Sequence, residues 1–226
     1  MAHMKPAAGD FRIFWDNAYA VHDLYDEGDT LLNIYNECVK AGSPDLPIIF
    51  TSTSKITFPG AGVAVEAASP NNVALLKGRM KYQTIGPDKL NQLRHARMFR
   101  TVSDIERHMK RHAAILRPKF ETVEKELQKQ LGDTGVAHWT TPKGGYFISL
   151  YVLEGCAKRV EQLCANAGMI LTPAGATYPY GIDPKDSNIR IAPSYPSVEE
   201  IEKASEVLAL AVRYAALEKL LSDKEN

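Results

Sequence analysis

Two apolar runs on either side of one amphipathic segment place the strongest limit on how this chain can fold. Residues 11–15 and 48–51 are short, β-branched and aromatic, which is typical of buried strands. Residues 30–41 between them repeat apolar side chains at helical spacing, with Asp29 as the predicted N-cap and Gly42 as the terminator. A strand, a helix and a second strand form the right-handed crossover unit of a mostly parallel sheet. The pattern therefore predicts an α/β fold.

Further elements follow in the first half of the chain. Residues 63–68 are small and apolar except for Glu66 and predict another buried strand, and Ser-Pro at the start of 69–76 predicts a helix. A loop then leads to a basic helix over residues 89–100. A Ser-x-x-Glu capping box opens residues 103–131, and we expect that helix to bend or break near Pro118.

After Gly135 the pattern changes to short strands mixed with helices. Strands are predicted at residues 136–139, 144–152 and 188–192. Helices are predicted from about Cys156 to Ala167, ended by Gly168, and from the Ser197-x-x-Glu200 capping box towards Leu221. This α+β half differs from the first half, so we place a domain boundary in the helix near residues 98–105. Residues 5–100 and 101–226 are the two expected domains, and residues 1–4 resemble a cloning remnant.

The overall composition excludes a general electrostatic attraction to nucleic acid or to anionic membranes. Lysine plus arginine and aspartate plus glutamate both number 27, so the formal net charge is zero. The three cysteines are odd in number and lack C-x-x-C spacing, which argues for a reducing compartment and against both a disulfide framework and a zinc site. The sequence has neither a long apolar run nor a signal-type start. We therefore expect a soluble, cytoplasmic protein with no nucleic-acid or membrane partner.

Lys55 is notable because it follows a predicted buried strand and lies among small hydroxyl side chains, in the segment Thr51-Ser52-Thr53-Ser54-Lys55. Desolvation at such a position lowers the pKa of an amine and frees its lone pair, so we interpret Lys55 as a Schiff-base lysine. Ser52-x-x-Lys55 also fits the S-x-x-K motif of penicillin-binding proteins and β-lactamases, but the S-D-N and K-T-G elements of that family do not occur here. A surface lysine that ends an edge strand is the third interpretation.

Two groups of basic residues have simpler explanations than a ligand site. His108 and His112 lie one helical turn apart, a spacing that can bind zinc, but Met109 stands where the H-E-x-x-H motif has glutamate. We therefore predict no metal site. A second basic group can bind an anion, although a solvated helix face is the commoner explanation of such a run; it contains Arg94, His95, Arg97 and Arg100.

Four short motifs occur in the order, and at about the separations, seen in one enzyme family. They are Asp16-x-x-Tyr19, Ser52-x-x-Lys55, Gly144-Gly145-Tyr146-Phe147 and Asn188-Ile189-Arg190. The combination resembles class I aminotransferases of pyridoxal phosphate (PLP) fold type I and is most similar to the type Ic aspartate aminotransferases. The resemblance extends over nearly the whole chain after residue 9. It implies a partial fold: the last strands and helices of the large PLP-binding domain in residues 5–100, and the α+β small C-terminal domain in residues 101–226.

The resemblance implies a role for five residues. Lys55 would form a Schiff base with PLP and later move a proton between the substrate Cα and the cofactor. Asp16 would keep the pyridine nitrogen protonated by charge pairing, and Tyr19 would hydrogen-bond the ring oxygen. Ser52 would contact the phosphate, and Arg190 would bind the substrate α-carboxylate with its planar fork. Structural explanations remain open: a turn cap for Asp16, a core tyrosine for Tyr19 and an ion-pair partner for Arg190.

The chain departs from the family pattern in two ways. Many relatives have an arginine for the cofactor phosphate eight positions after the lysine, but this chain has Val63. Backbone amides of residues 60–62, or the segment 83–84 of a partner subunit, are alternative phosphate donors. Family members are also nearly twice as long, and the N-terminal half that carries the Gly-rich phosphate loop and most of the substrate pocket has no counterpart here. We therefore expect the isolated chain to be inactive or nearly so.

The function that the resemblance implies is transamination between an amino acid, aspartate or a similar one, and a 2-oxo acid, with PLP as cofactor and a homodimeric full-length parent. One alternative is a non-catalytic, PLP-binding effector domain of a transcription regulator, because some regulators carry an aminotransferase-like domain with the same lysine. Another is an interaction or scaffold domain derived from the enzyme. Joint retention of Asp16, Tyr19, Lys55 and Arg190 argues against that last alternative.

Overall fold

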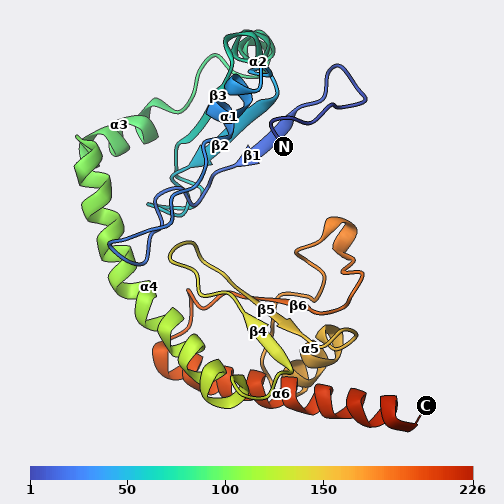
Figure 1. Cartoon of the computed structure of the whole chain (residues 1–226). Helices are drawn as coiled ribbons and strands as arrows, with labels where there is room; N and C mark the ends of the chain where they lie inside the picture. Colours follow the sequence, from blue (N-terminus) through green and yellow to red (C-terminus); the bar gives the residue numbers. More distant parts are fainter. Residues whose placement is uncertain (226) are drawn as a thin grey trace. The chain divides into compact units, whose positions relative to one another are not determined.

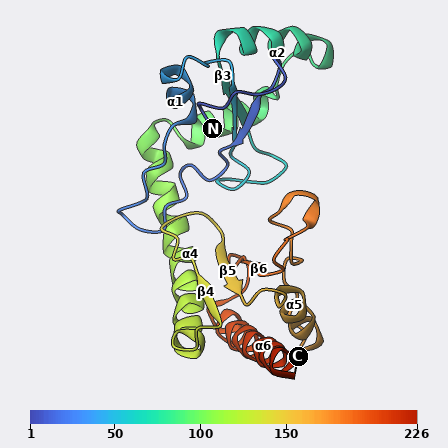
Figure 2. The ribbon, with the colours of Figure 1, turned by 45° about the vertical axis from the view of Figure 1, so that its right-hand side comes forward.

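The computed structural model describes residues 1–225, with the side chains of residues 1–224, and is drawn in Figures 1 and 2. The chain forms two compact units. The first contains residues 1–22 and 29–110, and the second contains residues 23–28 together with the chain from Arg111 onwards. Each unit combines helices with a three-stranded sheet, which confirms the predicted α/β class. Every helix within residues 1–225 is too short or too polar to span a lipid bilayer.

The sheet of the first unit contains the predicted crossover. Strand β1 (Ile13–Asp16) is parallel to β2 (Pro47–Ser52), and helix α1 (Ile34–Lys40) lies in the connection between them. Strand β3 (Ala64–Ala68) pairs with β2 in the antiparallel direction. Residues 53–63 are too few for the crossover that a parallel neighbour needs, so the chain returns directly along β2. The expectation that this third strand is buried is wrong, because β3 is almost entirely exposed in this chain.

Helix α1 begins later than its amphipathic pattern predicts. Its N-cap is Asn33 and not Asp29: the Asn33 Oδ1 atom accepts hydrogen bonds from the backbone amides of Tyr35 (3.0 Å) and Asn36 (3.1 Å). Leu31, which the pattern assigns to the apolar helix face, is exposed and lies before the helix. An asparagine next to the first turn satisfies amide groups that an aspartate four residues earlier does not reach.

Two shorter helices begin where the sequence predicts. They are α2 (Pro70–Gln83), capped by Ser69, and α3 (Lys89–Met98), capped by Asp88. The long helix α4 (Val102–Leu131) begins with a different capping box from the predicted one. The amide of Asp104 donates to Thr101 Oγ1 (3.3 Å), and the amide of Thr101 donates to the Asp104 carboxylate (2.9 Å). The box is therefore Thr101-x-x-Asp104, two residues before the predicted one.

Helix α4 continues through Pro118 as one helix, so of the expected bend or break the structure excludes the break. A proline inside a helix removes one backbone hydrogen bond, here the bond to the carbonyl of Ala114. Ala114 and Pro118 are both exposed, so water can satisfy that carbonyl. The hydroxyl of Thr122 donates to the Pro118 carbonyl (2.7 Å) and supports the following turn.

The second unit is built on an antiparallel sheet whose strands lie in chain order: β4 (Ala137–Trp139), β5 (Ile148–Val152) and β6 (Asn188–Ile191). Alternate residues of β5 are buried. That face packs against the C-terminal part of α4, against α5 (Ala157–Asn166) and against α6 (Val198–Glu225), as Figures 1 and 2 show. The Ser197-x-x-Glu200 capping box of α6 is confirmed, because the Ser197 amide donates to Glu200 (2.7 Å) and the Glu200 amide donates to Ser197 Oγ (3.2 Å).

The two units have apolar cores of very different size. The core of the first contains Ala2, Ile13, Ile34, Cys38 and Leu46. The core of the second joins residues from three helices and the sheet, among them Phe120, Leu127, Ile148, Leu150, Val160 and Leu208. Since stabilisation by apolar burial grows with the area removed from water, the first unit should unfold at a lower denaturant concentration.

Cysteine labelling tests this difference, because Cys38 lies in the smaller core and Cys156 and Cys164 lie in the larger one. Burial raises the pKa of all three thiols, to about 11 for Cys164, and the thiolate is the reactive form. We expect slow labelling in the native chain, and labelling of Cys38 at lower urea than the other two. Pulsed alkylation with peptide mass spectrometry measures this, and labelling in fully denaturing urea corrects for intrinsic reactivity. Coincident midpoints for all three thiols would mean one cooperative unit.

Candidate functional site

Lys55 lies in the turn that follows β2, on the loop of residues 53–63 that we call the lysine loop. Its side chain is exposed in this chain, so the desolvation invoked from the sequence is not supplied by residues 1–225. The Lys55 Nζ atom lies over the ring of Tyr19, 5.2 Å from the ring centroid. Tyr19 itself comes from the turn after β1. The structure thus brings together two of the predicted site residues that are far apart in sequence.

Asp16 and Ser52 are the last residues of the two parallel strands. Asp16 pairs with Phe50 in the register of β1 and β2, and its Oδ1 atom accepts a hydrogen bond from the Ala18 amide (3.0 Å). Parallel strands end at the same edge of a sheet, and this carboxyl edge is where open α/β sheets bind their ligands. One sheet edge of the first unit therefore carries or leads into all four of the predicted residues Asp16, Tyr19, Ser52 and Lys55.

The lysine loop is closed by contacts between its two ends. The Thr53 amide donates to the Val63 carbonyl (2.9 Å), and the Val63 amide donates to the Thr53 hydroxyl oxygen (2.9 Å). Gly62 lies against this closure: a Cβ atom there would be 2.9 Å from Thr53 Oγ1, so a larger residue would push the loop ends apart. Because the Val63 amide is already bonded, it is not a donor for a phosphate.

Three histidines from separate parts of the chain hold the same loop. His22 is buried, and its Nε2 atom lies 3.2 Å from the Lys55 carbonyl oxygen. His108 Nε2 lies 2.7 Å from the Ile56 carbonyl oxygen. His95 Nε2 lies 2.9 Å from the hydroxyl oxygens of both Thr53 and Thr57.

Sequence reasoning did not find this role for the histidines. The sequence pattern favours a solvated or anion-binding helix face for His95 and places His108 at a zinc-like spacing from His112. In the structure His108 bonds a backbone carbonyl, and the described residues contain no group of three or more metal-type ligands. No local pattern identifies these contacts, because they join residues 33 to 52 positions apart.

Arg190 is in the second unit, in the middle of β6, and is half-buried. Its guanidinium carbon lies 4.6 Å from the centroid of the Phe147 ring. The Arg190 Nε atom is buried, and among the described residues it has no hydrogen-bond partner. A buried donor without a partner is costly, so this atom is suited to an anionic ligand.

Asp183 fixes the chain where it enters β6. Its carboxylate accepts hydrogen bonds from the backbone amides of Lys185 (3.0 Å), Ser187 (2.8 Å) and Asn188 (2.9 Å). Burial by itself would raise the pKa of Asp183, but these amide hydrogen bonds hold that pKa below its ordinary value. Asp183 therefore fixes the segment that leads into β6, the strand that carries Arg190.

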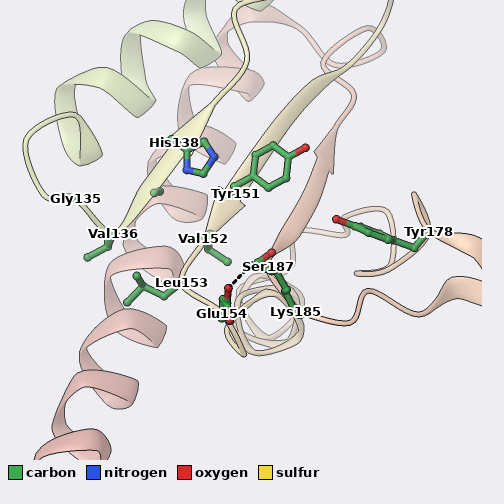
Figure 3. A pocket seen from close by; sticks show the side chains of 11 residues that line it. Gly135, Val136, His138, Tyr151, Val152, Leu153, Glu154, Tyr178, Lys185 and Ser187 are labelled. Carbon is green, nitrogen blue, oxygen red and sulfur yellow. Dashed lines mark hydrogen bonds and ion pairs between the residues drawn. The ribbon is translucent and has the colours of Figure 1, made fainter.

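A separate cavity of about 430 Å³ lies on the second unit, between β4, β5 and the segment before β6 (Figure 3). The rings of His138 and Tyr151 stack on its wall with centroids 4.9 Å apart, and an ion pair joins Lys185 to Glu154 (2.6 Å). The residues that line this cavity do not include a predicted site residue. The cavity is therefore distinct from the site built around Lys55.

Residues 1–224 match the family model described as aspartate amino-transferase. The chain belongs to the aspartate aminotransferase family. It is 47% identical over 224 residues to a putative aminotransferase of Mycolicibacterium smegmatis, an alignment that covers 99% of this chain and 52% of that protein. This membership confirms the resemblance inferred from the motifs.

Solved structures agree with the family assignment. A crystal structure of an aspartate transaminase from Corynebacterium glutamicum is 47% identical and superposes with a TM-score of 0.92, covering 96% of this chain and 51% of that one. The α-aminoadipate aminotransferase LysN of Thermus thermophilus, solved with N-(5'-phosphopyridoxyl)-L-leucine, is 21% identical with a TM-score of 0.72, covering 91% and 51%; at that identity it shows the shared fold alone. The fold is thus partial fold type I, and the chain spans about half the length of the relatives it matches.

Proposed function

We propose that this chain is the lysine-bearing half of a PLP-dependent aminotransferase that transfers an amino group from aspartate, or a similar amino acid, to a 2-oxo acid. The observation that carries the proposal is the Lys55 amine over the Tyr19 ring, at the sheet edge where Asp16 and Ser52 end their strands. An amine, a phenol, a carboxylate and a hydroxyl are the groups suited to the aldehyde, ring oxygen, ring nitrogen and phosphate of PLP. These four side-chain groups therefore match the functional groups of the cofactor.

Each of these residues has a defined task in the proposed reaction. When bound, PLP supplies a sink for the electrons of the substrate Cα–H bond. Lys55 would hold the cofactor through Nζ and would move a proton at the substrate Cα. Asp16 keeps a proton on the ring nitrogen, Tyr19 donates a hydrogen bond to the ring oxygen, and Ser52 contacts the phosphate.

Arg190 binds the α-carboxylate of the substrate in this proposal. Its buried Nε atom has no partner among the described residues, and a carboxylate can accept from Nε and a terminal nitrogen together. The Phe147 ring lies against the guanidinium and limits its motion. Lysine is not an equivalent replacement, because its ammonium lacks the planar fork.

The chain by itself is inactive or nearly so in this proposal, because it spans about half the length of its relatives. Residues 5–100 are part of the large domain of the parent enzyme, and residues 101–226 are its small domain. The parent is a homodimer. The preference for aspartate is supported by the name of the Corynebacterium glutamicum transaminase and by the family model.

Titration of the purified chain with PLP tests the proposal. We expect a saturable visible absorbance band from a lysine-bound cofactor, and borohydride should fix the cofactor to the peptide that contains Lys55. Addition of L-aspartate and 2-oxoglutarate should then give little or no turnover. A cofactor distributed evenly over surface lysines would refute the proposed site, and rapid turnover would refute the proposal that this chain alone is inactive.

A further inference from the structure

We infer that His95 is a positioning residue for Lys55: as a neutral imidazole protonated on Nδ1, it accepts a hydrogen bond from Thr53 and so keeps the lysine loop closed. The inference about loop geometry stands on contacts within the first unit. Its meaning for the cofactor rests on the proposed function of Lys55.

The tautomer follows from the partner of Nδ1. His95 Nδ1 lies 2.7 Å from the carbonyl oxygen of Asn91, one turn earlier in α3. A carbonyl oxygen only accepts hydrogen bonds, so Nδ1 must carry the proton. In the neutral ring the other nitrogen, Nε2, then has a lone pair and is an acceptor.

Of the two hydroxyl groups near Nε2, only that of Thr53 has a proton to donate to the lone pair. Thr57 Oγ1 donates to the Thr53 carbonyl (3.1 Å), which uses its only hydroxyl proton. Thr53 Oγ1 already accepts from the Val63 amide (2.9 Å), so its own proton is available for His95 Nε2 at 2.9 Å. The neutral Nδ1-protonated ring therefore satisfies both Thr53 and His95.

This chain of contacts acts on the lysine loop as a whole. Thr53 and Val63 are the two ends of the loop, and Lys55 lies between them. His95, in helix α3, accepts the proton of the Thr53 hydroxyl group and so orients it. The oxygen of that hydroxyl group accepts the hydrogen bond from the Val63 amide, so His95 fixes the closure of the lysine loop. His22 and His108 act differently, because each faces a backbone carbonyl and must donate through Nε2.

Nitrogen-15 NMR of the imidazole rings tests the tautomer in the unmodified chain. At pH about 8.5, above the ordinary titration range of histidine, we expect His95 to be protonated on Nδ1. His22 and His108 are internal references, because their contacts require protonation on Nε2. An Nε2-protonated His95 would overturn the inference, and this measurement does not depend on any variant or on PLP.

Two substitutions test the positioning role. His95→Leu removes the acceptor but keeps a side chain of comparable size, and amide hydrogen exchange at Val63 should become about tenfold faster. His95→Gln offers an oxygen to the Thr53 hydroxyl and should restore most of the protection. His138→Leu, in the second unit, should leave exchange at Val63 unchanged. Equal exchange in the leucine variant and the unmodified chain would refute the role.

Borohydride trapping of PLP on Lys55 links the loop to the cofactor. We expect trapping to fall several-fold in His95→Leu and to recover in His95→Gln, in parallel with exchange at Val63. If the unmodified chain does not trap PLP, the proposed function fails, while the tautomer and the exchange rates still decide the role of His95. If trapping is normal in the leucine variant although exchange is faster, His95 supports the loop without positioning the lysine.

Discussion

Replacement of Lys55 by alanine is expected to abolish the specific, borohydride-stable attachment of PLP to this chain. The Lys55 amine lies over Tyr19 at the sheet edge that also presents Asp16 and Ser52. Alanine removes the nucleophile, so the visible band of the lysine-bound cofactor should disappear as well. Absorbance titration and peptide mapping after reduction measure both effects.

Two matched variants show whether the attachment of PLP needs the Lys55 amine, a positive charge at that position or any exposed lysine. Lys55→Arg keeps a cation next to Tyr19, but a guanidinium stays protonated and should not attach the cofactor. Lys77→Ala removes an exposed lysine from α2 and should leave the specific attachment unchanged. Loss of the same amount of label in Lys77→Ala as in Lys55→Ala would show that the reaction is general surface modification.

Replacement of Asp183 by alanine is expected to destabilise the second unit by about 3 kcal/mol, because three backbone amides lose their acceptor and those of Ser187 and Asn188 belong to buried residues. Urea denaturation, followed by labelling of Cys156 and Cys164, reports on this unit. Asp133→Asn, at an exposed position after α4, is the control and should change the free energy of unfolding by less than about 0.5 kcal/mol.

The effect of Asp183 should depend on pH with a defined sign. Its folded-state pKa is held below the ordinary value, so the carboxylate stabilises the fold above the unfolded-state pKa of about 3.9. That contribution is lost as the pH falls through the folded-state pKa. The stability difference between the unmodified chain and Asp183→Ala should therefore be full at neutral pH and shrink in acid. A difference that grows in acid would contradict this role.

Elements defined by local patterns were predicted well. β1, β2, α5 and α6 follow from apolar spacing and from caps that lie next to them in the sequence, and the Ser197 capping box is present as expected. Errors occurred where several cap residues compete within a few positions. The caps that form are Asn33 and Thr101, where the sequence pattern favours Asp29 and Ser103, because sequence alone does not show which side chain meets the open amide groups.

For the candidate site, too, some features were predicted from the sequence and others are visible only in the structure. The order of its motifs predicted the family, which the comparisons show, and pointed to Lys55, Tyr19 and Arg190 as residues worth testing. The sequence left open whether Lys55 is a desolvated lysine or a surface lysine, and the structure shows that its side chain is exposed in this chain. Burial depends on every segment that packs around a residue, and the residues of this chain leave the Lys55 side chain open to solvent.

The sequence by itself determined the fold class and the family, and it pointed to Lys55 as the lysine to test. These properties depend on residue order, on side-chain period and on motif spacing, all of which are local or can be counted along the chain. Only the tertiary structure decided that His22, His95 and His108 hold the lysine loop and that Arg190 has a buried donor without a partner in the described residues. Hydrogen bonds between distant segments depend on where the fold places both partners, and no periodicity along the chain records that placement.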